Sequence, residues 1–88
     1  MTLAELIASM ESFVRGEAIS AQDAWKIEDA LRELFPEDPK LEDFADELAH
    51  YRPEGGDYLI NYNQMRPNVA YHLEGLRSIL ASSKGRPE

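Results

Sequence analysis

Glu47 and His50 are the side chains whose types and spacing are best suited to chemistry, because they form a Glu-x-x-His pattern. On a helix this spacing places a carboxylate near an imidazole, and two such motifs together hold paired metal ions in helix bundles. The second motif is missing here, since the other histidine, His72, has Val69 at the matching offset. The alternative is an exposed pair on a solvated helix face. We therefore expect no metal site and no cofactor.

Phosphate binding and nucleophilic catalysis also lack their sequence patterns. The Gly55-Gly56 pair has no Lys-Ser or Lys-Thr after it, so it indicates a turn and not a phosphate-binding loop. The chain contains no cysteine, which excludes disulfides, thiolate nucleophiles and thiolate metal sites. No Ser or Thr forms a recognisable motif with a histidine and a carboxylate. We expect a protein that is not an enzyme.

Carboxylates in the middle of the chain are a stronger signal. Residues 37–57 contain eight acidic and two basic residues, whereas residues 64–88 contain two acidic and four basic residues. The net charge of −8 repels phosphate backbones, so direct binding to nucleic acid is not expected. Such a surface suits a basic protein partner. The alternative is that the acids only solvate one face of a helix.

Four helical patterns must position these carboxylates within a single domain, residues 1–88. Thr2 with Glu5, and Ser20 with Asp23, are capping-box signals that precede apolar stripes of 3.6-residue period. Asp38-Pro39 is typical of a cap followed by a first-turn proline. The predicted helices span residues 3–15, 21–35 and 39–51, and a fourth begins at 63 or 64 and ends before a frayed tail, residues 82–88.

The expected fold is all-α, a small antiparallel four-helix bundle with a long ordered crossing loop between helices 3 and 4. Short connectors favour antiparallel neighbours. We expect the segment from Arg52 to Asn63 to cross the bundle as a strand that inserts Tyr58 and Ile60, and Pro67 to lie in the first turn of the last helix. The other predicted core residues are Leu6, Met10, Phe13, Ile27, Leu31, Leu34, Leu41, Phe44, Leu48, Val69, Leu73, Leu76 and Leu80.

The third helix separates apolar from acidic side chains. At about 100° per residue, its apolar residues, Leu41, Phe44, Ala45 and Leu48, share one side, and its acids share the other with His50. Pro53 interrupts the helix and brings two further acids, Glu54 and Asp57, to the same end of it. The predicted partner-binding residues are Asp43, Asp46, Glu47, His50, Glu54 and Asp57.

The aromatic residues have structural explanations. We expect Trp25 to pack in the core or against the crossing segment. The four tyrosines are expected to place their rings at the rim of the core and their hydroxyls in water. These are Tyr51, Tyr58, Tyr62 and Tyr71.

Residues 48–80 carry a resemblance to a known family. The pattern Tyr51-x-Pro53, then Asp57-Tyr58-Leu59-Ile60, then Val69-x-x-x-Leu73-x-x-Leu76-Arg77-Ser78-Ile79-Leu80 resembles the C-terminal half of the colicin D-type immunity proteins, also called bacterial self-protective colicin-like immunity proteins. The resemblance implies a small acidic four-helix bundle that covers the catalytic cleft of a tRNA-cleaving bacteriocin with groups that mimic tRNA phosphates. It also implies acids near the end of helix 3, where this chain keeps Glu47, Glu54 and Asp57 but adds His50 and Arg52.

On this basis we expect an immunity protein whose partner is a basic nuclease toxin domain. No run of about 18 apolar residues occurs, so we expect no membrane segment and a cytoplasmic protein, or one that travels with a secreted partner. A monomer is favoured. The alternative function is an acidic helical adaptor, antitoxin or secretion chaperone for another basic protein.

Overall fold

The computed structural model describes residues 1–84, which form four helices joined by loops. The helices are α1 (Leu3–Val14), α2 (Ala21–Leu34), α3 (Pro39–Ala49) and α4 (Tyr62–Lys84). No strand occurs in this range, where Tyr51 and Ile60 form an isolated parallel bridge. The prediction of an all-helical chain with four helices is confirmed. Helix α4 extends three residues into the predicted tail, and residues 85–88 of that tail lie outside the described residues.

Side-chain caps explain why the first two helices begin where the sequence predicts. Thr2 Oγ1 accepts a hydrogen bond from the Glu5 amide at 3.1 Å, and Glu5 Oε1 accepts one from the Thr2 amide at 2.8 Å. The hydrogen bond from the Thr2 backbone lowers the pKa of Glu5. Ser20 and Asp23 form the same reciprocal pair. Both capping boxes therefore satisfy amides that a helix start leaves free.

The last two helices begin with different caps. Asp38 Oδ1 accepts from the amides of Lys40 and Leu41 at 3.0 and 3.2 Å, with Pro39 in the first turn. Asn61 and Gln64 exchange side-chain bonds to each other's amides at 2.8 and 3.0 Å. This capping box starts α4 at Tyr62, slightly earlier than predicted.

Pro67 lies in the interior of α4, so the prediction that it occupies the first turn is wrong. A proline cannot donate a hydrogen bond to the carbonyl four residues earlier. That carbonyl belongs to Asn63, which is exposed to solvent, as Pro67 is. Water can therefore replace the missing donor.

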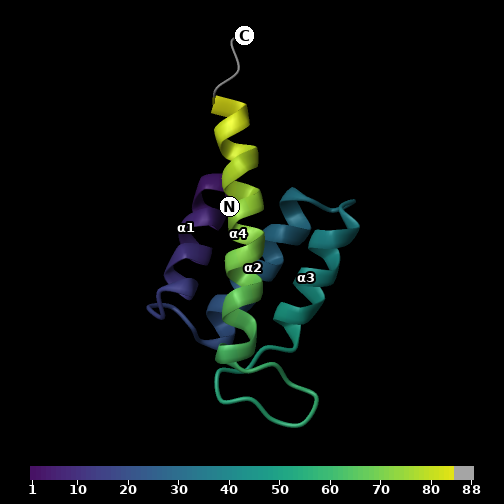
Figure 1. The fold of residues 1–88 in the computed structure, drawn as a ribbon. Helices are drawn as coiled ribbons and strands as arrows, with labels where there is room; N and C mark the ends of the chain where they lie inside the picture. The colour runs from purple at the N-terminus through teal and green to yellow at the C-terminus, as the bar shows by residue number, and fades with distance from the viewer. Residues whose placement is uncertain (85–88) are drawn as a thin grey trace.

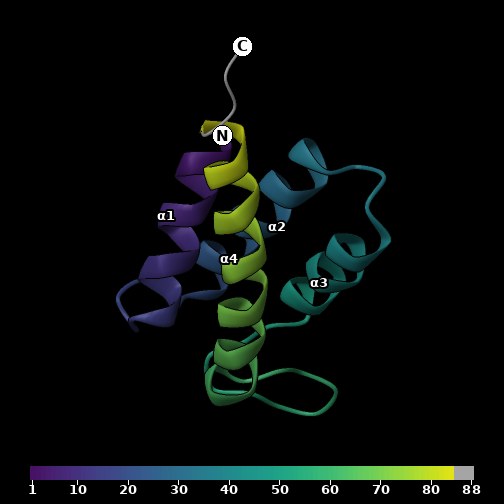
Figure 2. The ribbon, with the colours of Figure 1, turned by 45° about the horizontal axis from the view of Figure 1, so that its top comes forward.

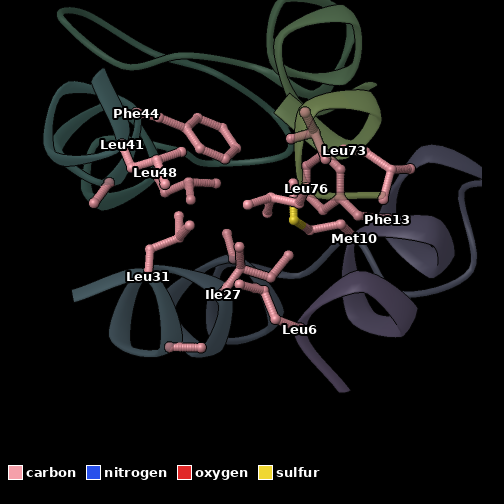
Figure 3. Packing of buried hydrophobic residues seen from close by; sticks show 14 of the residues in the cluster. Leu6, Met10, Phe13, Ile27, Leu31, Leu41, Phe44, Leu48, Leu73 and Leu76 are labelled. Carbon is pink, nitrogen blue, oxygen red and sulfur yellow. The ribbon is translucent and has the colours of Figure 1, made fainter. Parts of the chain in front are cut away.

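The helices are arranged around one apolar core. Helix α1 packs against α4 and α2, and α2 also packs against α3. Figure 1 and Figure 2 place α4 between α1 and α3, with α2 behind. Figure 3 shows that all four helices contribute to the core. The buried residues are Leu6, Ile7, Met10, Phe13, Ala24, Ile27, Ala30, Leu31, Leu41, Phe44, Ala45, Leu48, Tyr51, Met65, Val69, Leu73 and Leu76.

The core agrees with the predicted residues on the helices and differs in the segment before α4. Leu34, Leu80 and Ile60 are partly buried against the core. Tyr58, in contrast, is 99% exposed, so its predicted insertion is wrong. The segment is not a strand, and its side chains do not alternate between core and solvent.

Most large apolar side chains of the helices face the core, and the exceptions are Trp25, Tyr71 and Ile79, which are 37%, 71% and 47% exposed. Among the described residues, no helix combines the length and the apolar composition that crossing a membrane requires.

Candidate functional site

The outer face of α3 carries the first four predicted partner-binding residues. Asp43, Asp46 and His50 are exposed, and Glu47 is half-buried. About 100° separates neighbouring residues on a helix, so Asp46 and Glu47 lie on opposite flanks of this face with Asp43 between them. The two flanks contact different neighbouring helices.

Asp46 contacts α2 on one flank. Arg32 Nη2 donates to Asp46 Oδ1 at 2.8 Å, and Arg32 Nε donates to Glu28 Oε2 at 3.1 Å. The bond to Asp46 is the main cause of a raised pKa of Arg32. The Asp46 carboxylate is therefore held in place, and its charge is partly neutralised by an arginine of the same chain.

Glu47 contacts α4 on the other flank. Asn68 Nδ2 donates to Glu47 Oε2 at 2.6 Å. This bond fixes the carboxylate without neutralising it, because the amide is uncharged. Asp43, between the flanks, makes no ion pair or side-chain hydrogen bond within the described residues. Glu42, the first acid of α3, is exposed and unpaired in the same way.

The Glu47–His50 pair does not converge. His50 Nδ1 lies 2.9 Å from the Asp46 carbonyl oxygen and donates to it, while the Glu47 carboxylate is bonded to Asn68 on α4. Within residues 1–84, no group of three or more His, Cys, Asp or Glu side chains is placed to hold a metal ion.

The α3–α4 loop (residues 50–61) carries the other two predicted residues on a base that is tied to the bundle. The Ile60 amide donates to the His50 carbonyl at 3.0 Å, and the Arg52 amide donates to the Ile60 carbonyl at 2.9 Å. The Tyr62 amide reaches the Pro53 carbonyl at 3.4 Å. The two ends of the loop are thereby held side by side beneath the helices (Figure 1).

Two tyrosines lock this base to α1 and to the α1–α2 connection. Tyr51 is fully buried, and its hydroxyl donates to the Ile19 carbonyl at 2.7 Å. Burial raises the pKa of Tyr51 to about 12. The Tyr62 hydroxyl donates to the Phe13 carbonyl at 2.7 Å. The prediction that these two hydroxyls lie in water is wrong, because each donates to a backbone carbonyl.

Arg52 and His50, which depart from the pattern of the resembled family, both make contacts within this chain. The Arg52 guanidinium lies 4.9 Å from the centroid of the Trp25 ring and donates to the Tyr51 carbonyl at 2.7 Å. Trp25, 37% exposed, thus packs against the loop as predicted. His50 caps α3 through its bond to the Asp46 carbonyl.

The loop tip (residues 53–59) presents charge and one aromatic ring. Glu54 and Asp57 are exposed and make no ion pair or side-chain hydrogen bond within the part of the chain that the structure describes. Tyr58 follows Asp57 directly, with its ring in solvent. Together with Asp43, these acids are free to bind cations of a partner.

A groove of about 470 Å³ lies elsewhere, between the start of α3 and the second half of α4. Its lining includes Tyr71 and Ile79, which are 71% and 47% exposed, together with His72. The His72 ring stacks on Phe44 with 4.2 Å between ring centroids, and burial lowers its pKa. The groove is a second candidate surface for ligand binding.

We call the six predicted partner-binding residues together the acidic face. The structure divides them into two groups. Asp43, Glu54 and Asp57 are unpaired within residues 1–84, whereas Asp46, Glu47 and His50 bond within the chain. Sequence reasoning did not anticipate Arg32 or Asn68 as partners, and no sequence signal specifies such contacts between helices. It also missed Tyr58 as a surface residue, although the preceding Gly-Gly pair indicates a turn.

Comparison with known proteins leaves the acidic face as the main guide to function. No family model matches the chain, and neither the search of curated proteins nor the search of solved structures finds a match.

Proposed function

We propose that this chain is an immunity protein that inhibits a basic nuclease toxin domain of the tRNase type. In this proposal a cytoplasmic monomer, built as a small antiparallel bundle crossed by the α3–α4 loop, places the acidic face over the catalytic cleft of the toxin. Its carboxylates replace tRNA phosphates. The protein performs no chemistry and binds no nucleic acid, membrane or cofactor.

One observation carries the proposal: unpaired carboxylates stand on a rigid support. Asp43 on α3, and Glu54 and Asp57 on the pinned loop, are exposed without partners in the described chain. A nuclease must hold an anionic backbone with Lys, Arg and His, and fixed carboxylates form charge-assisted bonds with such groups. Because the supports are already ordered, little entropy is lost on binding.

The test is a pair of double charge reversals in cells that produce a tRNase-type toxin from a reading frame next to that of this chain. Glu54→Lys with Asp57→Lys should abolish protection, because two contacts become repulsive. Asp29→Lys with Glu33→Lys is the matched control, since it makes the same change in net charge at two exposed acids of α2 that are not among the predicted partner-binding residues. The control should still protect.

Stability measurements keep this test interpretable. Both double variants change side chains outside the core, so each should unfold within about 0.5 kcal/mol of the parent. Full protection by the loop variant would show that Glu54 and Asp57 do not bind the toxin, and the proposed mechanism would be wrong.

The groove favours a second candidate, an adaptor, antitoxin or secretion chaperone for an amphipathic helix with basic residues. Tyr71 and Ile79 would contact the apolar side of that helix, and Asp38 and Glu74 at the groove would pair with its cations. A neighbouring reading frame for a toxin with a basic nuclease domain supports immunity. A neighbouring secretion or regulatory operon supports the adaptor.

A further inference from the structure

Tyr58 is the most exposed large apolar side chain of the described residues, and the fold gives no reason for it. Its ring is 99% exposed. Its hydroxyl makes no hydrogen bond within the described chain, whereas the hydroxyls of Tyr51 and Tyr62 each donate to a backbone carbonyl. A ring that stays in water gains nothing from burial when the chain folds. Tyr58 is therefore not needed for the core.

The backbone of Tyr58 makes the choice of residue still less favourable for folding. Tyr58 has a φ of +63° and is the third residue of a turn that the Leu59 amide closes onto the Gly56 carbonyl at 3.1 Å. Glycine or asparagine adopts this left-handed conformation at lower cost than tyrosine. Costly conformations of this kind persist where the surroundings hold them, and they gather at functional sites.

The surroundings do hold the turn. The Gly55 amide donates to the Arg52 carbonyl at 2.9 Å, which closes a first turn directly before the second. A Cβ on Gly55 would lie 3.2 Å from Asn61 Cβ, and one on Gly56 would lie 3.1 Å from Leu59 Cδ1. The tip is thus packed upon itself, and the ring of Tyr58 is directed outward before any partner binds. Figure 2 shows the loop projecting beyond α3 and α4.

The charges beside the ring indicate which partner it fits. Asp57 precedes Tyr58 in the same turn, and Glu54 stands in the turn before it. A nucleic acid that stacked a base on the ring would bring phosphates against these carboxylates, which repel them. A protein pocket with an apolar floor and a rim of Lys or Arg matches both the ring and the acids.

We infer that Tyr58 is the anchor of the partner interface, inserting its ring into an apolar pocket whose basic rim pairs with Glu54 and Asp57. This inference rests on the proposed function and adds a residue of a different chemical kind to the acidic face. Tyrosines in such positions dominate many interfaces because a large ring is buried with few rotatable bonds to fix. The acids increase the rate of association with the basic partner, and the buried ring slows dissociation of the complex.

The experiment measures binding of a basic tRNase-type nuclease domain from a reading frame next to that of this chain, in a catalytically inactive form, together with urea unfolding of each variant. Tyr58→Asn keeps a residue that tolerates positive φ and removes the ring. We expect its unfolding midpoint to equal or exceed that of the parent, while the dissociation constant rises at least about 30-fold, mainly through faster dissociation. Tyr58→Phe keeps the ring and should bind within about threefold of the parent, because an aromatic anchor depends mainly on its buried ring.

The outcomes separate this inference from the function on which it rests. If the parent binds the nuclease domain and Tyr58→Asn binds within about threefold of it, the anchor is refuted and the proposed function stands, because so small a change is too little for an anchor. A parent that does not bind the domain refutes both. A Tyr58→Asn variant that unfolds at clearly lower urea would give the ring a structural role and would also refute the anchor.

Discussion

Tyr51 and Tyr58 are seven positions apart in one connection, yet one is sealed in the core and the other stands in solvent. Tyr51 fills space beside Phe13, with ring centroids 5.1 Å apart, and satisfies the Ile19 carbonyl. Tyr58 makes no such contacts and sits on a strained turn. The difference shows that the two parts of one connection have different environments. Its base holds the bundle together, and its tip is available to a partner.

Truncation of the buried ring is the strongest way to test this division. Tyr51→Ala should lower the free energy of unfolding by about 3–5 kcal/mol, because it leaves a cavity and an unpaired carbonyl. Urea denaturation followed by circular dichroism measures the loss. The matched change at the tip, Tyr58→Asn, should cost nothing or stabilise by up to about 1 kcal/mol. Equal losses at the two positions would contradict the division.

Removal of a single hydroxyl is a finer test of the base. Tyr62→Phe deletes a hydroxyl that donates to the Phe13 carbonyl and should destabilise by about 1 kcal/mol, the typical net contribution of one hydrogen bond, while the Gly16 amide still donates to that carbonyl. Tyr58→Phe deletes an unbonded hydroxyl and is the control. We expect no measurable change in its unfolding midpoint. A Tyr62→Phe variant as stable as the parent would show that water replaces the bond.

The smallest expected effect lies outside the connection, at His72. Burial lowers its pKa in the folded state, and nearby Asp38 opposes that shift. The unfolded chain then binds the proton more tightly, so stability should fall as pH decreases through the usual histidine pKa of about 6.5. His72→Gln should have a flatter pH dependence of its urea midpoint. If the urea midpoint of His72→Gln depends on pH as steeply as that of the parent, His72 does not cause the pH dependence.

Local signals predicted the helices well because helix starts are determined by a few neighbouring residues. The caps at Thr2, Ser20 and Asp38 each bond within three residues along the chain. The same logic could have found the start of α4, since Asn61 and Gln64 have the spacing of a capping box. The capping box was missed because the segment before α4 was interpreted as a strand.

The candidate site was predictable only in part, because its chemistry depends on contacts between helices. Helix geometry placed Asp46 and Glu47 on the outer side of α3. It could not show that Arg32 and Asn68 reach these acids from the two neighbouring helices. Reversing Asp46 and Glu47 would therefore break bonds within the chain as well as change the surface charge. Glu54 and Asp57 are better positions for testing function.

The direction of Tyr58 could not be predicted by alternation. A strand would have sent Tyr58, Ile60 and Tyr62 to the same side. The turn at residues 56–59 interrupts that pattern, so Ile60 and Tyr62 pack inward while Tyr58 points away. The positive φ of Tyr58 is typical of a turn, but its large apolar side chain is typical of a strand, so the sequence pattern indicated the wrong structure.

The proposed function requires that the unpaired acids guide a basic nuclease domain onto the acidic face. Its most direct test is the association rate constant of that domain, measured by stopped flow as salt is raised. The parent's rate should fall steeply with salt, since the Debye length is only about 8 Å at physiological strength. In low salt, Glu54→Lys with Asp57→Lys should slow association at least about tenfold, and Asp29→Lys with Glu33→Lys should slow it far less. Equal rates for the parent and the loop variant in low salt would contradict the proposed function.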